Sequence, residues 1–283
     1  MKKQSGSFMR RIFLLLLLAG FGYAGYVVWE QKDALVGSLD VWHSQEPVHT
    51  FELACMPESI MQKHQKELLR TSEHSFGKAY VTFSPLLLMH IKYAQEGRQT
   101  IEATSIWDLM TAEMILDTHT FETTHGFEDC INSQATDDDF RILHALSKHN
   151  GSRNSEQLAQ ELGMDRDILS QRLELLRKKH LIVQKLDTIQ LHFQSPLLKV
   201  SPKTNLTLPV VSKVIASSAQ INRRYSREQV QKLAKAAFGN DFAIRSTQEV
   251  FLPIVVIEVQ NPDSSILKTY WNGITGKRLS LRI

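Results

Sequence analysis

The chain has 283 residues, of which 42% are hydrophobic, so it can bury real cores and is not too polar to fold, and its length fits two or three domains. Its net charge of +3 favours no class of partner, but the charges are unevenly distributed. Residues 30–136 carry 7 basic and 16 acidic side chains, residues 137–195 carry 9 of each, and residues 196–283 carry 13 and 5. The acidic front and the basic back could attract each other or could simply be solvated faces.

Residues 1–29 have the pattern of the signal or anchor segment of an exported chain. An uncharged apolar run, residues 12–28, ends at Trp29 and follows four basic residues, Lys2, Lys3, Arg10 and Arg11. Such a run can span a bilayer, and its basic flank should stay in the cytoplasm while everything after residue 30 lies outside. A signal peptide cleaved near residues 22–24 is the alternative. We favour an uncleaved anchor in a bacterial inner membrane, and both interpretations export the chain.

Residues 30–131 are predicted to form a first small α/β module. A helical stretch at 58–71 comes before Phe83-Ser84-Pro85 and the apolar strand 86–91. After a polar turn, a second strand carries Trp107.

Few side chains in this module could carry chemistry. Cys55 and Cys130 bracket it, and an exported protein can oxidise such a pair, although two buried free thiols are an equally good interpretation. His119, Glu122 and His125 are spaced unlike the zinc ligands of known hydrolases and lie in a turn-rich stretch. We therefore predict no metal, no cofactor and no enzymatic activity, and keep a hydrolase using these histidines only as a weak third hypothesis.

Residues 132–195 are predicted to form the central module, with three short helices and then a two-stranded ribbon. Ser155 can cap the second helix, which ends at Gly163, and Asp165 can cap the third. The apolar residues at helical spacing are Phe140, Leu143 and Leu146 in the first helix, Leu158, Ala159 and Leu162 in the second, and Ile168, Leu169, Leu173 and Leu176 in the third. Two strands, 181–183 and 189–193, follow around the turn 186–188. This order resembles the winged helix-turn-helix of bacterial regulators.

A winged helix raises the question of nucleic acid. The side chains that would contact DNA are Arg166, Gln171, Arg172, Arg177, Lys178, Lys179 and Lys185. The module as a whole is neutral, however, and the first turn of its third helix contains two aspartates. The membrane topology would also place it across the bilayer from the chromosome. We therefore expect the winged helix to be a packing or protein-binding scaffold, with its third helix covered around Leu175 by a flanking module.

Residues 196–222 form a linker with three prolines in its first half, which predicts an extended opening, and residues 210–221 could be helical.

Residues 223–283 are predicted to form a second module that repeats the first. A helical stretch at 226–238 precedes Phe251-Leu252-Pro253, an apolar strand at 254–259 and a strand that carries Trp271. The Phe-x-Pro motifs of the two copies are 168 residues apart and the tryptophans 164, so the copies differ by a four-residue loop change. A shared order and spacing favour a duplication, in which each tryptophan packs against the helix of its own copy.

The end of the second copy, Tyr270 to Lys277, contains Thr275-Gly276-Lys277 and resembles the closing strand of PepSY-type modules. That resemblance implies one helix on a small antiparallel sheet, outside the cytoplasm, that contacts or restrains another protein without catalytic residues. The first copy has Ala112 where the glycine should be, so we expect its turn to differ.

The sequence thus predicts an α+β protein with an N-terminal transmembrane helix and two related small α/β modules flanking a winged helix-turn-helix. The favoured function is non-enzymatic interaction or regulation at the outer face of the inner membrane, with a protein partner. The alternative is a membrane-tethered winged-helix regulator that binds DNA and has the opposite topology.

Overall fold

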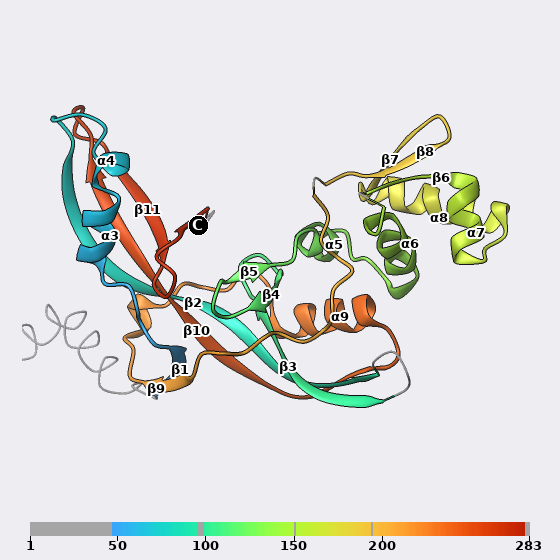
Figure 1. Ribbon diagram of the computed structural model, residues 1–283, viewed down its shortest axis with the longest axis horizontal. Helices are drawn as coiled ribbons and strands as arrows, with labels where there is room; N and C mark the ends of the chain where they lie inside the picture. The colour runs from blue at the N-terminus through green and yellow to red at the C-terminus, as the bar shows by residue number, and fades with distance from the viewer. Residues whose placement is uncertain (1–46, 95–98, 150, 194, 281–283) are drawn as a thin grey trace, which may run out of the picture. The chain divides into compact units, whose positions relative to one another are not determined.

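The computed structural model describes residues 47–94, 99–149, 151–193 and 195–280 (Figure 1). It is a mixed α+β structure, and every α-helix and β-strand below belongs to one unit, residues 47–213 and 218–283. The described strands of its large sheet are β1 (Val48–Phe51), β2 (Ser75–Ala94), β3 (Thr100–Asp108), β4 (Met114–Asp117), β5 (Glu122–Thr123), β9 (Val210–Lys213), β10 (Phe242–Gln260), β11 (Ile266–Asn272) and β12 (Arg278–Leu279). A small sheet contains β6 (Ser152–Asn154), β7 (Ile182–Lys185) and β8 (Thr188–Leu191). The described α-helices are α3 (Pro57–Lys63), α4 (Gln65–Leu68), α5 (Phe127–Asn132), α6 (Asp137–Ser147), α7 (Ser155–Leu162), α8 (Arg166–Lys178) and α9 (Arg227–Phe238).

The predicted anchor, residues 12–28, lies outside the described residues. Among the helices that the structure does describe, none is long and apolar enough to cross a membrane.

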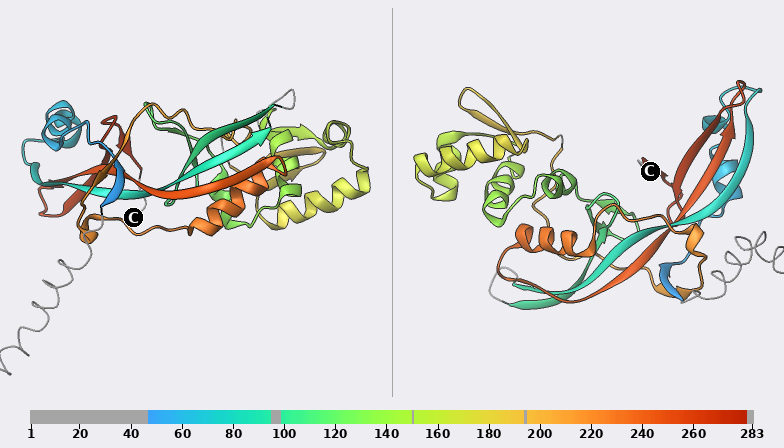
Figure 2. Two further views of the ribbon diagram at one scale, coloured as in Figure 1. Left: turned by 90° about the horizontal axis from the view of Figure 1, so that it is seen from below. Right: turned by 180° about the vertical axis from the view of Figure 1, so that it is seen from behind.

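The two longest strands, β2 and β10, pair with each other at the centre of the large sheet. Figures 1 and 2 show them side by side in every view. Ser84 lies opposite Leu252, and on either side of this pair Phe83 meets Pro253 and Pro85 meets Phe251. Because both strands carry Phe-x-Pro, the ladder has a local two-fold symmetry about its central pair. We predicted two separate modules, but the repeated segments share one sheet because their long strands are each other's partners.

The strands on the two sides of this centre pair in the same register. Trp107 of β3 lies opposite Leu87 of β2, and Trp271 of β11 lies opposite Val255 of β10. β4 and β12 then pair with these strands, Trp107 with Met114 and Trp271 with Arg278. Corresponding residues of the two long strands are 168 positions apart, and those of the strands that follow are 164 positions apart. We therefore call residues 48–117 the first copy and residues 219–279 the second copy.

The turns after the two tryptophans also correspond. The N–H of Ala112 donates to the carbonyl of Asp108, and that of Gly276 to the carbonyl of Asn272, both at 2.8 Å. Ala112 has φ 59° and Gly276 has φ 65°. Our prediction that the alanine changes the turn was wrong, because Ala112 adopts the left-handed conformation that glycine takes without strain.

Each helix packs against the other copy. From the first copy, Ile60 of α3 and Leu68 of α4 are buried in one cluster with Trp271. From the second copy, Phe238 of α9 has its ring 6.2 Å from that of Trp107. The prediction that each tryptophan contacts its own helix was therefore wrong.

The segments that lead into the helices explain this exchange. β1 pairs with β10, where Thr50 lies opposite Phe251, and Gln220 forms a bridge with Phe83 of β2. Each leading segment thus joins the long strand of the other copy before its helix begins. The helix that follows is carried onto that copy as well.

The central segment follows the predicted order of helices, with small changes. Asn154, not Ser155, caps α7, since its side chain accepts the N–H of Glu156 at 2.8 Å. Asp165 caps α8 as predicted, and Gly163 ends α7 in a left-handed conformation with φ 61°. β6 pairs with β8, which adds a third strand to the predicted ribbon.

The helix expected within residues 210–221 was wrong, and of the two interpretations left open for the cysteines the structure shows free thiols. Residues 210–221 contain strand β9 and a short 3-10 helix, Ser217–Ala219, because β9 pairs with β1. Cys55 and Cys130 are both free thiols. Cys130 is buried in the cluster around Trp107, whereas Cys55 packs against the cluster around Trp271, so the two belong to separate parts of the core.

Candidate protein-interaction surface on helix α8

Helix α8 is amphipathic, with a buried and an exposed apolar side. Leu169, Leu173 and Leu176 are at most 5% exposed and face the core. Ile168 and Leu175 are 54% and 47% exposed. Residues seven apart lie on the same side of a helix after two turns, so these two side chains point in one direction. We call Ile168, Gln171, Arg172 and Leu175 the α8 outer face.

Sequence reasoning misplaced both of the apolar residues in this face. Ile168 was assigned to the buried side with Leu169, although neighbours on a helix are about 100° apart and only one of them can face the core directly. Leu175 was expected to lie under a flanking module, yet almost half of it is exposed. The signal that could have found the face is the seven-residue spacing of two apolar residues outside the core pattern.

The β7–β8 hairpin adds more exposed apolar surface to the same segment. Leu186, at its tip, is 95% exposed and has φ 53°, and Val183 is 37% exposed. The N–H of Ser155 donates to the carbonyl of Asp187 at 3.1 Å, which holds the tip against the start of α7. The position of this apolar tip is therefore fixed by the fold.

Four of the seven predicted DNA-contacting residues are in ion pairs within the segment. They are Arg166 with Glu156, Arg172 with Asp138 at 2.8 Å, Lys178 with Glu174 at 2.9 Å, and Lys179 with Asp139 at 2.6 Å. The first three pairs are exposed to solvent and therefore weak. Gln171, Arg177 and Lys185 are exposed and have no ion pair among the described residues. The structure thus does not gather the seven side chains into one free basic surface.

Lys179 has a structural role instead. Its ammonium group lies against the carboxylate of Asp139, which is nearly buried, and also donates to the carbonyl of Gln134 at 3.2 Å. Burial of Asp139 opposes its ionisation, but the bonds from Lys179 and from the N–H and hydroxyl of Thr136 outweigh this and lower its pKa. This network fixes the end of α8 to the start of α6.

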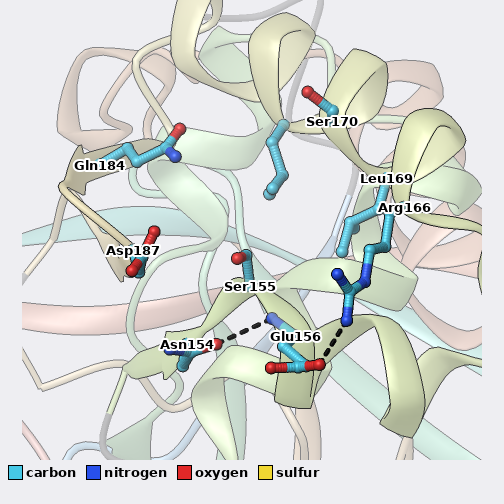
Figure 3. Close-up of a pocket in the computed structure, with 9 residues that line it drawn as sticks. Asn154, Ser155, Glu156, Arg166, Leu169, Ser170, Gln184 and Asp187 are labelled. Carbon is cyan, nitrogen blue, oxygen red and sulfur yellow. Dashed lines mark hydrogen bonds and ion pairs between the residues drawn. The ribbon is translucent and has the colours of Figure 1, made fainter.

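A hollow of about 330 Å³ lies between the start of α7, one side of α8 and the hairpin (Figure 3). The carboxylate of Glu156 is bound by Arg166 on one side of it, and Asp187 and Gln184 come from the hairpin on the other. Ser155 stands between them and belongs to the first turn of α7. Among the described residues, no hydrogen bond joins the side chain of this serine to a histidine or a carboxylate, which are the groups that activate a nucleophilic hydroxyl.

The histidines of the weak hydrolase hypothesis lie elsewhere. His119 and His125 are exposed beside β5, in the turn-rich stretch expected from the sequence. Among the described residues, no three His, Cys, Asp or Glu side chains lie close enough together to hold a metal ion.

Comparison with known proteins identifies no relative of the chain. No family model, no curated protein and no solved structure matches the chain. Any functional interpretation therefore depends on the geometry of its own residues.

Proposed function

We propose that the chain is a non-enzymatic interaction or regulatory protein, anchored in a bacterial inner membrane by residues 12–28, with the α8 outer face as its protein-binding surface. The observation that carries the proposal is that Ile168 and Leu175 lie exposed on the same side of one helix. Apolar side chains grouped on a surface are typical of protein-binding sites, because contact with a partner removes them from water.

In this proposal the segment 137–193 is a winged helix-turn-helix used as a scaffold, and the two copies are related to PepSY-type modules. The order helix, strand, helix, helix, hairpin supports the first assignment. The second is supported by the helix, long strand and Trp-bearing strand that occur in each copy, and by the turn at Thr275-Gly276-Lys277. The bulk of the chain then lies outside the cytoplasm.

The alternative function, a membrane-tethered regulator that binds DNA, has one observation in its favour. Gln171, Arg177 and Lys185 are exposed and form no ion pair with another described residue, so they could reach bases or phosphates. With 9 basic and 9 acidic residues in 137–195, however, the segment has no electrostatic excess with which to attract a polyanion.

A photo-reactive amino acid placed in living cells distinguishes the two functions. At Leu175 we expect a discrete protein adduct, and at Gln160, an exposed position on α7, we expect none. Adding Ile168→Lys to the Leu175 probe should abolish the adduct. A DNA adduct at Leu175, or equal protein adducts at both positions, would contradict the proposal.

Salt-dependent DNA binding and topology provide the second test. Full-length protein should bind duplex DNA weakly, and Arg177→Glu with Lys185→Glu should change this binding little. Sub-micromolar, sequence-selective binding at physiological salt would favour the alternative. A reporter fused after Ile283 should be active only outside the cytoplasm, and activity inside would refute the proposed orientation.

A further inference from the structure

Among the described residues, no strand pairs with most of the outer edge of β11. The ladder with β12 covers only Tyr270 and Trp271, and among the described residues no other strand pairs with β11 on that side. Ile266 and Leu267, in the unpaired part, are 61% and 41% exposed. Natural proteins usually protect such edges with charges or with covering segments, because an open edge accepts further strands. Here the only charge in this part is that of Lys268, whose ammonium group is bound to Glu258 at 3.3 Å.

The equivalent edge in the first copy is covered by the chain itself. Thr204, in the segment between β8 and β9, donates its N–H to the carbonyl of Thr104 in β3 at 2.8 Å. Its hydroxyl accepts the N–H of Ile106 at 2.8 Å and donates to the carbonyl of Ile115 in β4 at 2.6 Å. Asn205 continues the contact by donating to the carbonyl of Leu116 at 2.8 Å. An extended segment with a threonine at its centre therefore closes this edge.

The two edges correspond residue by residue. Tyr270 pairs with Leu279 as Ile106 pairs with Ile115. The backbone groups that bind Thr204 in the first copy thus have counterparts at Lys268, Tyr270 and Leu279 in the second. One difference favours an apolar contact in the second copy, since Ile266 occupies the position of Glu102.

We propose that the outer edge of β11 is a docking site for an extended segment of a partner protein, which carries a threonine or serine in the place of Thr204 and adds as a strand antiparallel to β11. The direction follows from the first copy, where Asn205 runs parallel to β4 and so antiparallel to β3. The main chain of β11 supplies the hydrogen bonds, and Ile266 and Leu267 supply apolar contacts.

A second copy of this chain fits the edge less well than a partner segment. Two β11 edges paired about Lys268 would place two ammonium groups directly opposite each other, and like charges in that position destabilise a sheet. The connecting segment brings no such conflict, because it meets the edge with a hydroxyl group. This site does not depend on the α8 outer face.

The probe is a fluorescein-labelled peptide with the sequence of residues 201–208, titrated against the full-length protein and followed by fluorescence anisotropy. We expect saturable binding that Ile266→Lys weakens at least about tenfold. Glu102→Lys, the matched change on the occupied edge, should leave the affinity unchanged. A peptide with valine in place of its first threonine should bind more weakly, because the hydroxyl accepts one hydrogen bond and donates another. Ile168→Lys should have no effect, which separates this site from the proposed function.

Three results would overturn the proposal. They are no saturation up to about 1 mM peptide, equal weakening by Glu102→Lys and Ile266→Lys, and a wild-type dimer that Ile266→Lys converts to a monomer. The second would mean that the peptide displaces the connecting segment. The third would assign the edge to another copy of the chain. Thermal melts of both variants, expected to match the wild type, confirm that they are folded.

Discussion

Asp108 is the residue whose replacement tests the correspondence between the two copies most directly. Its side chain accepts the N–H of Met110 at 2.6 Å, as Asn272 accepts the N–H of Ile274 at 2.8 Å. A neutral amide therefore performs in the second copy what a carboxylate performs in the first. Because an amide oxygen can accept the same bond, we expect Asp108→Asn to preserve the turn.

The charge is what the substitution removes. Burial raises the pKa of Asp108 from 3.8 to about 6, and the nearby carboxylates of Glu113 and Glu128 act in the same direction against backbone bonds that lower it. The folded chain thus keeps a proton on Asp108 that the unfolded chain has already lost between pH 3.8 and about 6. Stability therefore falls as the pH rises through this window, and above it the ionised group costs up to about 3 kcal/mol.

Urea denaturation at several pH values measures this cost. Asp108→Asn should raise the free energy of unfolding by up to about 3 kcal/mol at pH 7.5, and this gain should shrink to about 1 kcal/mol at pH 4.5. Asn272→Asp, the matched change in the second copy, should destabilise the protein at pH 7.5. A neutral or destabilising Asp108→Asn at pH 7.5, or a gain that does not change with pH, would refute the reasoning.

Two further predictions concern the turn of the second copy and the base of α8. Gly276→Ala should lower the stability of the protein by only about 1 kcal/mol, because Ala112 adopts the same conformation in the first copy. Gly273→Ala should lower it more, because the new Cβ would lie 2.7 Å from the carbonyl oxygen of Pro253. Thermal unfolding of the two variants compares these costs. Lys179→Met should destabilise the protein by about 3 kcal/mol by leaving Asp139 without its cation, and Lys178→Met, in an exposed pair, should change stability by less than about 0.5 kcal/mol. Equal effects within either pair of variants would contradict the corresponding argument.

Local patterns predicted the central segment well, because its helices are short and carry their own start and stop signals. Asp165 and Gly163 are cap residues whose effect depends only on their neighbours. Asn154 and Ser155 can both cap a helix and stand side by side. The hydrogen bond from the N–H of Ser155 to the hairpin determines that Asn154 is the cap, and the local sequence does not reveal this bond.

Pairing between distant strands could not be predicted in the same way. The apolar windows 86–91 and 254–259 overlap the buried runs of β2 and β10, residues 83–89 and 250–257, but each strand also contains more polar residues at its start. Those residues are held by the partner strand rather than by burial, and that partner lies about 170 residues away in the chain. The repeat was visible in the sequence, whereas the exchange of helices between its copies was not. The same holds for the candidate surface, since the exposure of Leu175 depends on which elements cover α8.

The exchange of helices predicts a specific pattern of energetic coupling. Phe238 is the last residue of α9 in the second copy and Leu68 the last residue of α4 in the first, but Phe238 packs near Trp107 and Leu68 is buried with Trp271. Double-mutant cycles with alanine should therefore give a coupling of about 0.5–1.5 kcal/mol for Trp107 with Phe238 and for Trp271 with Leu68.

The pairs within one copy, Trp107 with Leu68 and Trp271 with Phe238, should give a coupling near zero, because they belong to separate clusters. The four cycles share the same four single variants, so differences in the cost of each truncation cancel. Measurable coupling only within a copy would mean that each helix packs on its own tryptophan. In that case the two copies would be independent modules joined by a common sheet, and neither would need the other to bury its tryptophan.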